Sequence, residues 1–186
     1  MNKLRVVSLL SALCIAIIIL SCSKGYTGKT YTNTIPMTSA QVATANGLVI
    51  PPSPGSATAQ VSYDDVTHIL NYTISWTNLS GPPVAIHIHG IGDKGQIALP
   101  APLGPYGVDS FKVSGTTYIK YVGGIAQKIT VPSGSTNSGS ISGALFADNV
   151  VIKQNDLVNG KYYFDIHTAT NQLYIAFGEV RGQIVF

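Results

Sequence analysis

Residues 56–76 read SATAQVSYDDVTHILNYTISW, and this stretch decides the fold class. Apolar and polar residues alternate in its first half, and the alternation returns in its second half after Asp64 and Asp65. A period of two places alternate side chains on opposite faces of a β-strand. The stretch therefore predicts a β-hairpin with one apolar face against a core. The expected core positions are Ala57, Ala59, Val61, Tyr63, Leu70, Tyr72, Ile74 and Trp76.

The rest of the chain is typical of an all-β protein. Glycine and proline recur at short intervals, with 19 glycines and 10 prolines among 186 residues, and strong helix formers are scarce. Such punctuation favours many short strands joined by turns, which build a β-sandwich or barrel. We expect further strands within residues 29–37, 83–90, 118–132, 138–146, 160–168 and 178–186. Residues 92–115 are expected to form an irregular connection, and residues 144–158 are the best candidate for a short helix.

The N-terminal segment has the pattern of a secretory signal peptide. Lys3 and Arg5 precede an apolar run at residues 6–20 that is too short for a comfortable membrane span. The sequence Ile19-Leu20-Ser21-Cys22 resembles a bacterial lipobox, in which the peptidase cuts before the cysteine that carries the lipid. We expect residues 1–21 to be removed and Cys22 to be lipidated. The alternative is an ordinary signal peptide with a chance cysteine.

The expected mature protein is a secreted lipoprotein, exported across the inner membrane and anchored in a membrane by its lipid. Residues 22–28 form the lipidated cysteine and a polar tether, and residues 29–186 form one domain. Ser23 is compatible with the outer membrane, with the domain facing the periplasm or the cell exterior. Without Lys3 and Arg5 the 11 basic residues become 9, against 8 acidic ones. This balance, with no basic cluster, argues against a nucleic-acid partner.

Four segments in order resemble a known family. They are residues 50–63 (IPPSPGSATAQVSY), 85–97 (AIHIHGIGDKGQI), 157–168 (LVNGKYYFDIHT) and 178–184 (GEVRGQI). Together they resemble the CHRD domain, the module repeated in chordin and found as a single copy in bacterial secreted proteins. The resemblance spans roughly residues 29–186 and implies an immunoglobulin-like β-sandwich or barrel. Residues 169–178 (ATNQLYIAFG) replace the short Pro-Gly-Gly turn that is usual in the family.

Two histidines stand one residue apart in the segment AIHIHG. In a strand, His87 and His89 share one face with Ala85, while Val84, Ile86 and Ile88 share the other, and the two isoleucines are expected in the core. The Cβ atoms of the two histidines would lie roughly 6–7 Å apart, close enough for both rings to reach one ion.

A third histidine belongs to the segment YYFDIHT. There His167 shares a face with Asp165 and Tyr163. If the two strands are neighbours, His87, His89 and His167 converge, and three imidazoles suit zinc or copper. Two alternatives remain open: a buried hydrogen-bond network without a metal, and a recognition surface for a ligand.

The segment HIHGIGD also looks like the His-x-His-x-x-Gly-Asp stretch of copper–zinc superoxide dismutases, which share a Greek-key β-sandwich. Those enzymes need a four-histidine copper site, and most add a zinc site and a disulfide. This chain has only four histidines in all, and it has no spare cysteine because Cys14 lies in the expected signal peptide and Cys22 is expected to be lipidated. The remaining one, His68, is expected as an exposed turn residue. Full dismutase chemistry is therefore not expected.

The last predicted strand carries two charged residues on one face, Glu179 and Arg181, near Gly178 and Gly182. Glu179 could accept a hydrogen bond from a histidine, and Arg181 could pair with Asp165. The favoured alternative is an ion pair between Glu179 and Arg181. The glycines suggest close approach of another segment.

No pattern in the chain indicates catalysis. It has no nucleophile–base–orienter triad, phosphate loop, paired-carboxylate site or Gly-x-Ser-x-Gly elbow, so no catalytic residue is assigned. The main hypothesis is a non-catalytic envelope module that binds a protein or glycan partner. The alternative is a zinc- or copper-binding β-domain.

Overall fold

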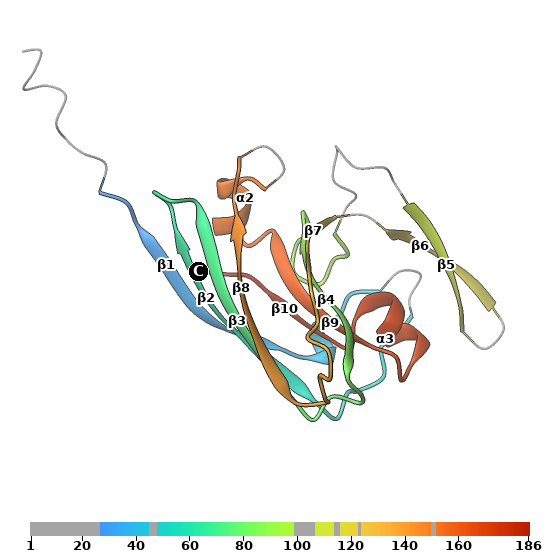
Figure 1. The fold of residues 1–186 in the computed structure, drawn as a ribbon. Coiled ribbons are helices and arrows are strands. Elements are labelled where there is room, and N and C mark those ends of the chain that lie inside the picture. The colour runs from blue at the N-terminus through green and yellow to red at the C-terminus, as the bar shows by residue number, and fades with distance from the viewer. Residues whose placement is uncertain (1–26, 45–47, 99–106, 114–115, 123, 150–151) are drawn as a thin grey trace, which may run out of the picture.

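Two antiparallel sheets pack face to face in the computed structural model, which describes residues 27–44, 48–98, 107–113, 116–122, 124–149 and 152–186 (Figure 1). The first sheet has the order β1-β2-β3-β8, and the second has the order β10-β9-β4-β7. The first sheet consists of β1 (Thr30–Met37), β2 (Ser56–Asp64), β3 (Ile69–Thr77) and β8 (Gly139–Phe146). The second consists of β10 (Val180–Gln183), β9 (Tyr162–Thr168), β4 (Pro83–Gly90) and β7 (Ile125–Ile129). The predicted all-β sandwich is confirmed.

The predicted hairpin forms β2 and β3. Ala57 lies opposite Trp76, and Tyr63 lies opposite Leu70. All eight predicted core positions are at most 5% exposed. His68 occupies the turn with a φ of 60° and is half-buried rather than exposed, with its Nδ1 3.5 Å from the Tyr63 hydroxyl.

The second sheet supplies the other half of the core. Ile86 and Ile88 are fully buried, as predicted, and the Tyr72 and Phe164 rings of opposite sheets meet edge to face with centroids 5.5 Å apart. Each such buried side chain contributes roughly 1.5–3 kcal/mol through removal of apolar surface from water. Val84, which shares the alternation of the two isoleucines, is nevertheless 54% exposed. The pairing of β4 with β9 shifts register between Pro83 and Ala85, and this shift interrupts the alternation.

The close approach predicted at the glycines of the last strand is found at Gly182. A Cβ at this position would lie 2.6 Å from Met37 Cγ and 2.9 Å from Ile35 Cγ2, both on β1. A larger residue would push the two sheets apart at this edge.

Two predictions outside the sheets need correction. Residues 144–146 belong to β8, and in the described part of the range 144–158 the one helix is α2 (Gln154–Val158). Residues 92–115 are not wholly irregular, because β5 (Gly107–Val113) pairs with β6 (Thr116–Val122) as a separate hairpin. A 3₁₀ turn, η1 (Ser39–Gln41), follows β1.

A further helix, α3 (Gln172–Phe177), occupies the segment that replaces the family's short turn. The Asn171 side chain caps it by accepting a hydrogen bond from the Leu173 N–H (2.8 Å), and Gly178 ends it with a φ of 90°. Leu173 and Phe177 pack on Ile50 and neighbouring apolar residues, which holds α3 on the outer side of the second sheet (Figure 1).

No helix in the described part of the chain is long and apolar enough to cross a membrane. The predicted signal peptide and Cys22 lie outside the described residues.

Candidate metal centre

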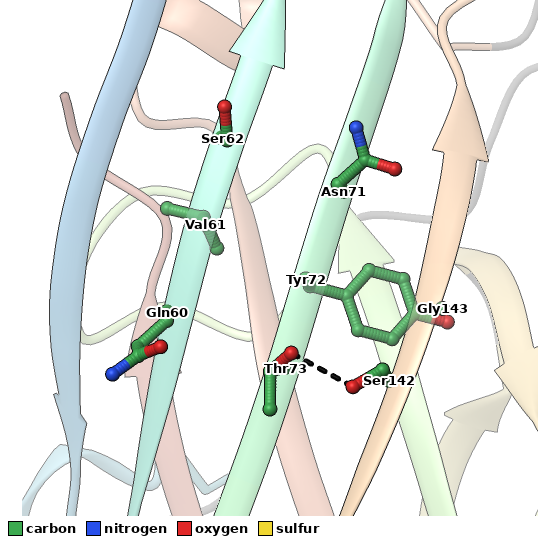
Figure 2. Close-up of a pocket in the computed structure, with 8 residues that line it drawn as sticks. All are labelled: Gln60, Val61, Ser62, Asn71, Tyr72, Thr73, Ser142 and Gly143. Atoms are coloured by element: carbon green, nitrogen blue, oxygen red, sulfur yellow. Dashed lines mark hydrogen bonds between the residues drawn. The ribbon is translucent and has the colours of Figure 1, made fainter.

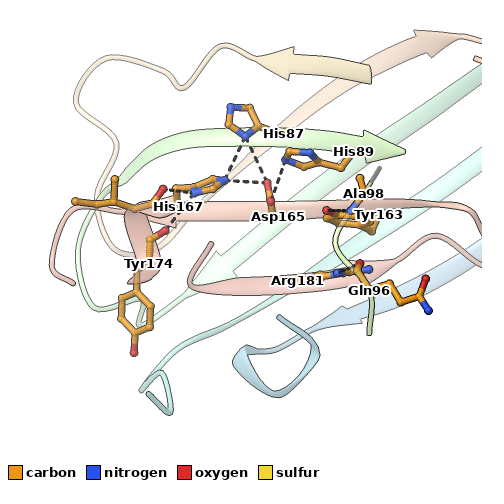
Figure 3. A network of polar contacts seen from close by, with 10 residues as sticks. His87, His89, Gln96, Ala98, Tyr163, Asp165, His167, Tyr174 and Arg181 are labelled. Atoms are coloured by element: carbon orange, nitrogen blue, oxygen red, sulfur yellow. Dashed lines mark hydrogen bonds and ion pairs between the residues drawn. The ribbon is translucent and has the colours of Figure 1, made fainter. Parts of the chain in front are cut away.

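The pairing of β4 with β9 assembles a cluster of ionisable side chains. His87 lies opposite Asp165, His89 opposite Tyr163, and Ala85 opposite His167. Residues directly opposite in an antiparallel pair project from the same face. This face points away from the core, and Figure 3 shows the three imidazoles arranged around the Asp165 carboxylate. The structure thus brings together the three histidines singled out in the sequence.

The cluster is tight. The Asp165 Oδ1 atom lies 3.2 Å from His167 Nε2 and 3.6 Å from His87 Nδ1, and the Oδ2 atom lies 3.1 Å from His89 Nε2. His87 Nδ1 and His167 Nε2 are 3.2 Å apart. One ligand atom from each of the four residues lies within 4.8 Å of all the others. Asp165, which the sequence placed beside the histidines, therefore lies among them.

Helix α3 determines which nitrogen of His167 faces the cluster. His167 Nδ1 lies 3.1 Å from the Tyr174 carbonyl oxygen and 2.9 Å from the Ile175 carbonyl oxygen. A carbonyl oxygen only accepts hydrogen bonds, so we assign the hydrogen to Nδ1. In the neutral ring, Nε2 then carries a lone pair directed at Asp165 and His87. The segment missed in the sequence thus orients a member of the cluster.

Tyr163 holds the ring of His89. The two rings are stacked, with centroids 5.1 Å apart and planes inclined by 14°. The Arg181 guanidinium lies over the Tyr163 ring, 3.5 Å from its centroid, and the Ala98 N–H donates to the phenolic oxygen (3.1 Å). Burial, followed by the charge of Asp165, raises the pKa of Tyr163 to about 12, so the phenol is neutral at physiological pH.

Arg181 ties the loop at residues 92–98 to the sheet. It donates to the carbonyl oxygens of Gln96 (2.6 Å) and Asp93 (3.1 Å) and to Gln183 Oε1 (2.9 Å). Burial lowers the pKa of Arg181, partly offset by Tyr163 and Asp165. The guanidinium therefore supports the cluster through Tyr163 rather than through the ion pair with Glu179 favoured from the sequence.

Glu179 belongs to a neighbouring polar network. Its carboxylate accepts hydrogen bonds from the Ser53 hydroxyl, from the Ser80 N–H (2.8 Å) and hydroxyl (2.6 Å), and from the Thr168 hydroxyl (2.5 Å). Burial would raise the pKa of Glu179, but these hydrogen bonds outweigh it and hold the pKa below its ordinary value of 4.5. The side chain is fully buried, and these partners give it a structural role instead of the histidine contact considered from the sequence.

Three buried polar atoms of the cluster have no hydrogen-bond partner among the described residues: both ring nitrogens of His89 and Oδ1 of Asp165. The contacts of these atoms within the cluster are close enough for ion pairs but lack hydrogen-bond geometry. Burial would raise the pKa of Asp165, but positive charge on His89 and His167 outweighs it and holds the pKa well below its ordinary value. The carboxylate thus requires positive charge nearby, supplied either by protons on the imidazoles or by a cation.

Comparison with known proteins places the chain in a family. No curated protein and no solved structure matches it. The family model of the CHRD domain matches residues 35–184, which include the whole cluster and all strands of both sheets except the first half of β1. The chain therefore belongs to the CHRD domain family.

Proposed function

We propose that this domain binds one divalent transition-metal ion, zinc or copper, through His87, His89, Asp165 and His167. The observation that carries the proposal is the convergence of four ligand atoms within 4.8 Å of one another on a buried face. Three imidazoles and one carboxylate form a donor set that suits zinc and copper. The proposed role is binding without catalysis.

The spacing of the donors supports zinc in particular. Zinc bonds of about 2.0–2.1 Å in a tetrahedron separate neighbouring ligand atoms by about 3.3–3.4 Å. The four contacts between Asp165, His87, His89 and His167 range from 3.1 to 3.6 Å. The ligand atoms of the other pairs lie up to 4.8 Å apart, so a bound ion would draw these side chains closer together. Copper(II) is the second candidate because nitrogen-rich sites bind it strongly.

The unpaired atoms support a cation over a hydrogen-bond network. A buried polar atom without a partner costs about 1–3 kcal/mol. A dication bound to Asp165 and to Nε2 of His89 would remove part of that cost. It would also replace protons that the imidazoles must otherwise carry beside the carboxylate.

Metal analysis and thermal unfolding test the proposal. The protein is purified as residues 23–186 without a histidine tag, stripped with chelator and titrated with Zn²⁺ or Cu²⁺ in a calorimeter. We expect one equivalent to bind and the melting temperature to rise, since an ion at 100 times its Kd stabilises the fold by about 2.7 kcal/mol.

A double variant, His87→Ala with His167→Ala, should abolish both effects. His68→Ala is the matched control, because His68 is the one histidine outside the cluster. A wild-type protein that binds neither ion, with a melting temperature indifferent to both, would leave only the hydrogen-bond network.

We propose in addition that the domain is a lipoprotein of the cell envelope. The lipobox-like sequence Ile19-Leu20-Ser21-Cys22 supports export across the inner membrane, cleavage before Cys22 and anchoring by its lipid, with the outer membrane as the expected site. Wild-type protein should enter the detergent phase, whereas Cys22→Ser should be soluble and Cys14→Ser should behave as wild type. A Cys22→Ser protein that stays in the membrane fraction contradicts the anchor.

A further inference from the structure

The central part of the outer face of the first sheet is uncharged and regular, whereas Asp64 lies at its end in the row Thr30-Asp64-Ile69-Phe146. Three rows of directly paired residues cross its four strands: Thr32-Ser62-Asn71-Ala144, Thr34-Gln60-Thr73-Ser142 and Pro36-Thr58-Ser75-Ser140. We call these twelve residues the hydroxyl face. Ten of them carry a hydroxyl or an amide, none carries a charge, and all are exposed or half-buried.

The hydroxyl face is uncovered in the described part of the chain. In Figure 1, α3 and the β5–β6 hairpin lie on the side of the second sheet, away from the outer side of β1, β2, β3 and β8. The ten hydroxyl and amide side chains of the hydroxyl face therefore meet solvent.

A shallow hollow of about 430 Å³ lies at the centre of this face (Figure 2). Gln60 and Asn71 line it, together with Thr73 of β3 and Ser142 of β8. The hydroxyls of Thr73 and Ser142 form a hydrogen bond (2.8 Å between the oxygens). Among the described residues it is the one hydrogen bond between two side chains of the hydroxyl face. The other donors and acceptors are available to a partner.

The chemistry of the hydroxyl face selects the kind of partner. Nucleic acids and anionic membranes are bound through lysine and arginine, which this face lacks. Its polar groups repeat at about 4.8 Å across the strands and about 6.7 Å along them. Closely spaced groups that both donate and accept, without charge, complement a neutral chain rich in hydroxyls. We propose that the hydroxyl face binds a neutral polysaccharide in an extended conformation.

The proposed location of the domain at the cell envelope is consistent with a polysaccharide partner. Seven residues lie between Cys22 and Thr30, the first residue of β1, and the fully extended chain from one to the other reaches at most about 29 Å. A lipid on Cys22 would hold the first sheet close to the membrane, among the polysaccharides of the envelope. The setting rests on the proposed lipid anchor, whereas the hydroxyl face is independent of the proposed metal.

Binding to insoluble neutral polysaccharides tests the inference. Soluble protein, residues 23–186, is incubated with microcrystalline cellulose and with chitin, and the bound fraction is measured against concentration. We expect saturable binding to at least one of them. The variant Gln60→Ala with Thr73→Ala should weaken it at least fivefold, because both changes remove polar groups from the hollow.

Thr130→Ala with Ser133→Ala is the matched control, because both residues are exposed and lie outside the hydroxyl face. Circular dichroism and melting temperature verify that each variant folds. Three results would overturn the inference: no binding to either polymer, equal binding by the hollow variant, or preference for heparin or anionic phosphatidylglycerol vesicles. Self-association through this face, seen by sedimentation and lost in the hollow variant, would assign it to a second copy instead. Loss of metal binding affects none of these readouts.

Discussion

The two sheets of this domain have similar inner faces and very different outer faces. Both inner faces are apolar and meet in one core. The central part of the outer face of the first sheet is a neutral array of small hydroxyl and amide residues open to solvent. The outer face of the second sheet carries His89, Asp165, His167 and Arg181, all less than 9% exposed.

The difference shows that ionisable groups on the outer face of a β-sandwich are buried only where further segments cover them and supply hydrogen bonds. Helix α3 and the loop at residues 92–98 form a partial third layer over the second sheet. Backbone groups of this layer form hydrogen bonds with the side chains of His167, Tyr163 and Arg181. A charge removed from water must be paired or hydrogen-bonded to be tolerated. The second outer face is therefore committed to specific partners, whereas the first remains free for an external one.

The largest expected effect is on Glu179, whose network joins the second sheet to two distant loops. Glu179→Ala removes a carboxylate with four hydrogen bonds and leaves the Ser80 N–H and buried hydroxyls without an acceptor. We expect a loss of about 3–4 kcal/mol in the free energy of unfolding, measured with urea. Thr58→Ala on the open face should change it by no more than about 0.5 kcal/mol. Similar losses in both variants would contradict the contrast between the faces.

The ionisation of the Glu179 carboxylate makes the stability of the fold depend on pH. Because the folded state lowers the pKa of Glu179 below 4.5, it favours the ionised form, and this stabilisation is complete above that pH. It declines as the pH falls through 4.5 towards the folded-state pKa. The stability gap between wild type and Glu179→Gln should thus be constant above about pH 5.5 and shrink below pH 4.5. A gap that stays constant down to pH 3 would mean that the hydrogen bonds do not favour the ionised carboxylate.

Local patterns predicted the sheets well because alternation is a property of neighbouring residues. The hairpin at residues 56–76 and the shared face of Asp165 and His167 both followed from a period of two. The prediction that His167 lies beside His87 needed one further assumption, that β4 and β9 are neighbouring strands. Where pairing slips, as at Val84, alternation no longer predicts burial.

Features that depend on distant contacts could not be predicted in this way. Helix α3 has six residues, too few to be stable by propensity, and depends on packing against residues far away in the chain. The partners of Glu179 lie 126, 99 and 11 residues away at Ser53, Ser80 and Thr168. Sequence spacing carries no signal for such contacts, so Glu179 was considered with Arg181 and the histidines instead.

An intermediate effect is expected at Tyr163, which links Arg181 to the proposed metal site. Tyr163→Leu removes the surface on which His89 stacks and the ring beneath the guanidinium. Groups that orient a metal ligand typically change affinity 10–100-fold, so we expect zinc affinity to fall at least tenfold in calorimetry. Tyr163→Phe keeps the stack and should stay within threefold of wild type. Equal affinity in all three proteins would show that the stack does not orient His89.

The smallest effect is expected on the hydroxyl face, within a single strand. Thr73→Val removes one exposed hydroxyl and its hydrogen bond to Ser142, but keeps a β-branched shape suited to a strand. We expect a change within about 0.5 kcal/mol. The adjacent Ile74→Val, on the inner face and fully buried, should cost about 0.5–1.5 kcal/mol because it leaves a cavity. Urea unfolding of the two variants compares the faces of β3 directly.

A larger loss of stability from Thr73→Val than from Ile74→Val would mean that the outer hydroxyls contribute to the stability of the fold. The expected order instead means that Ile74 on the inner face contributes more to stability than Thr73 on the outer face, as expected if the outer residues serve a partner.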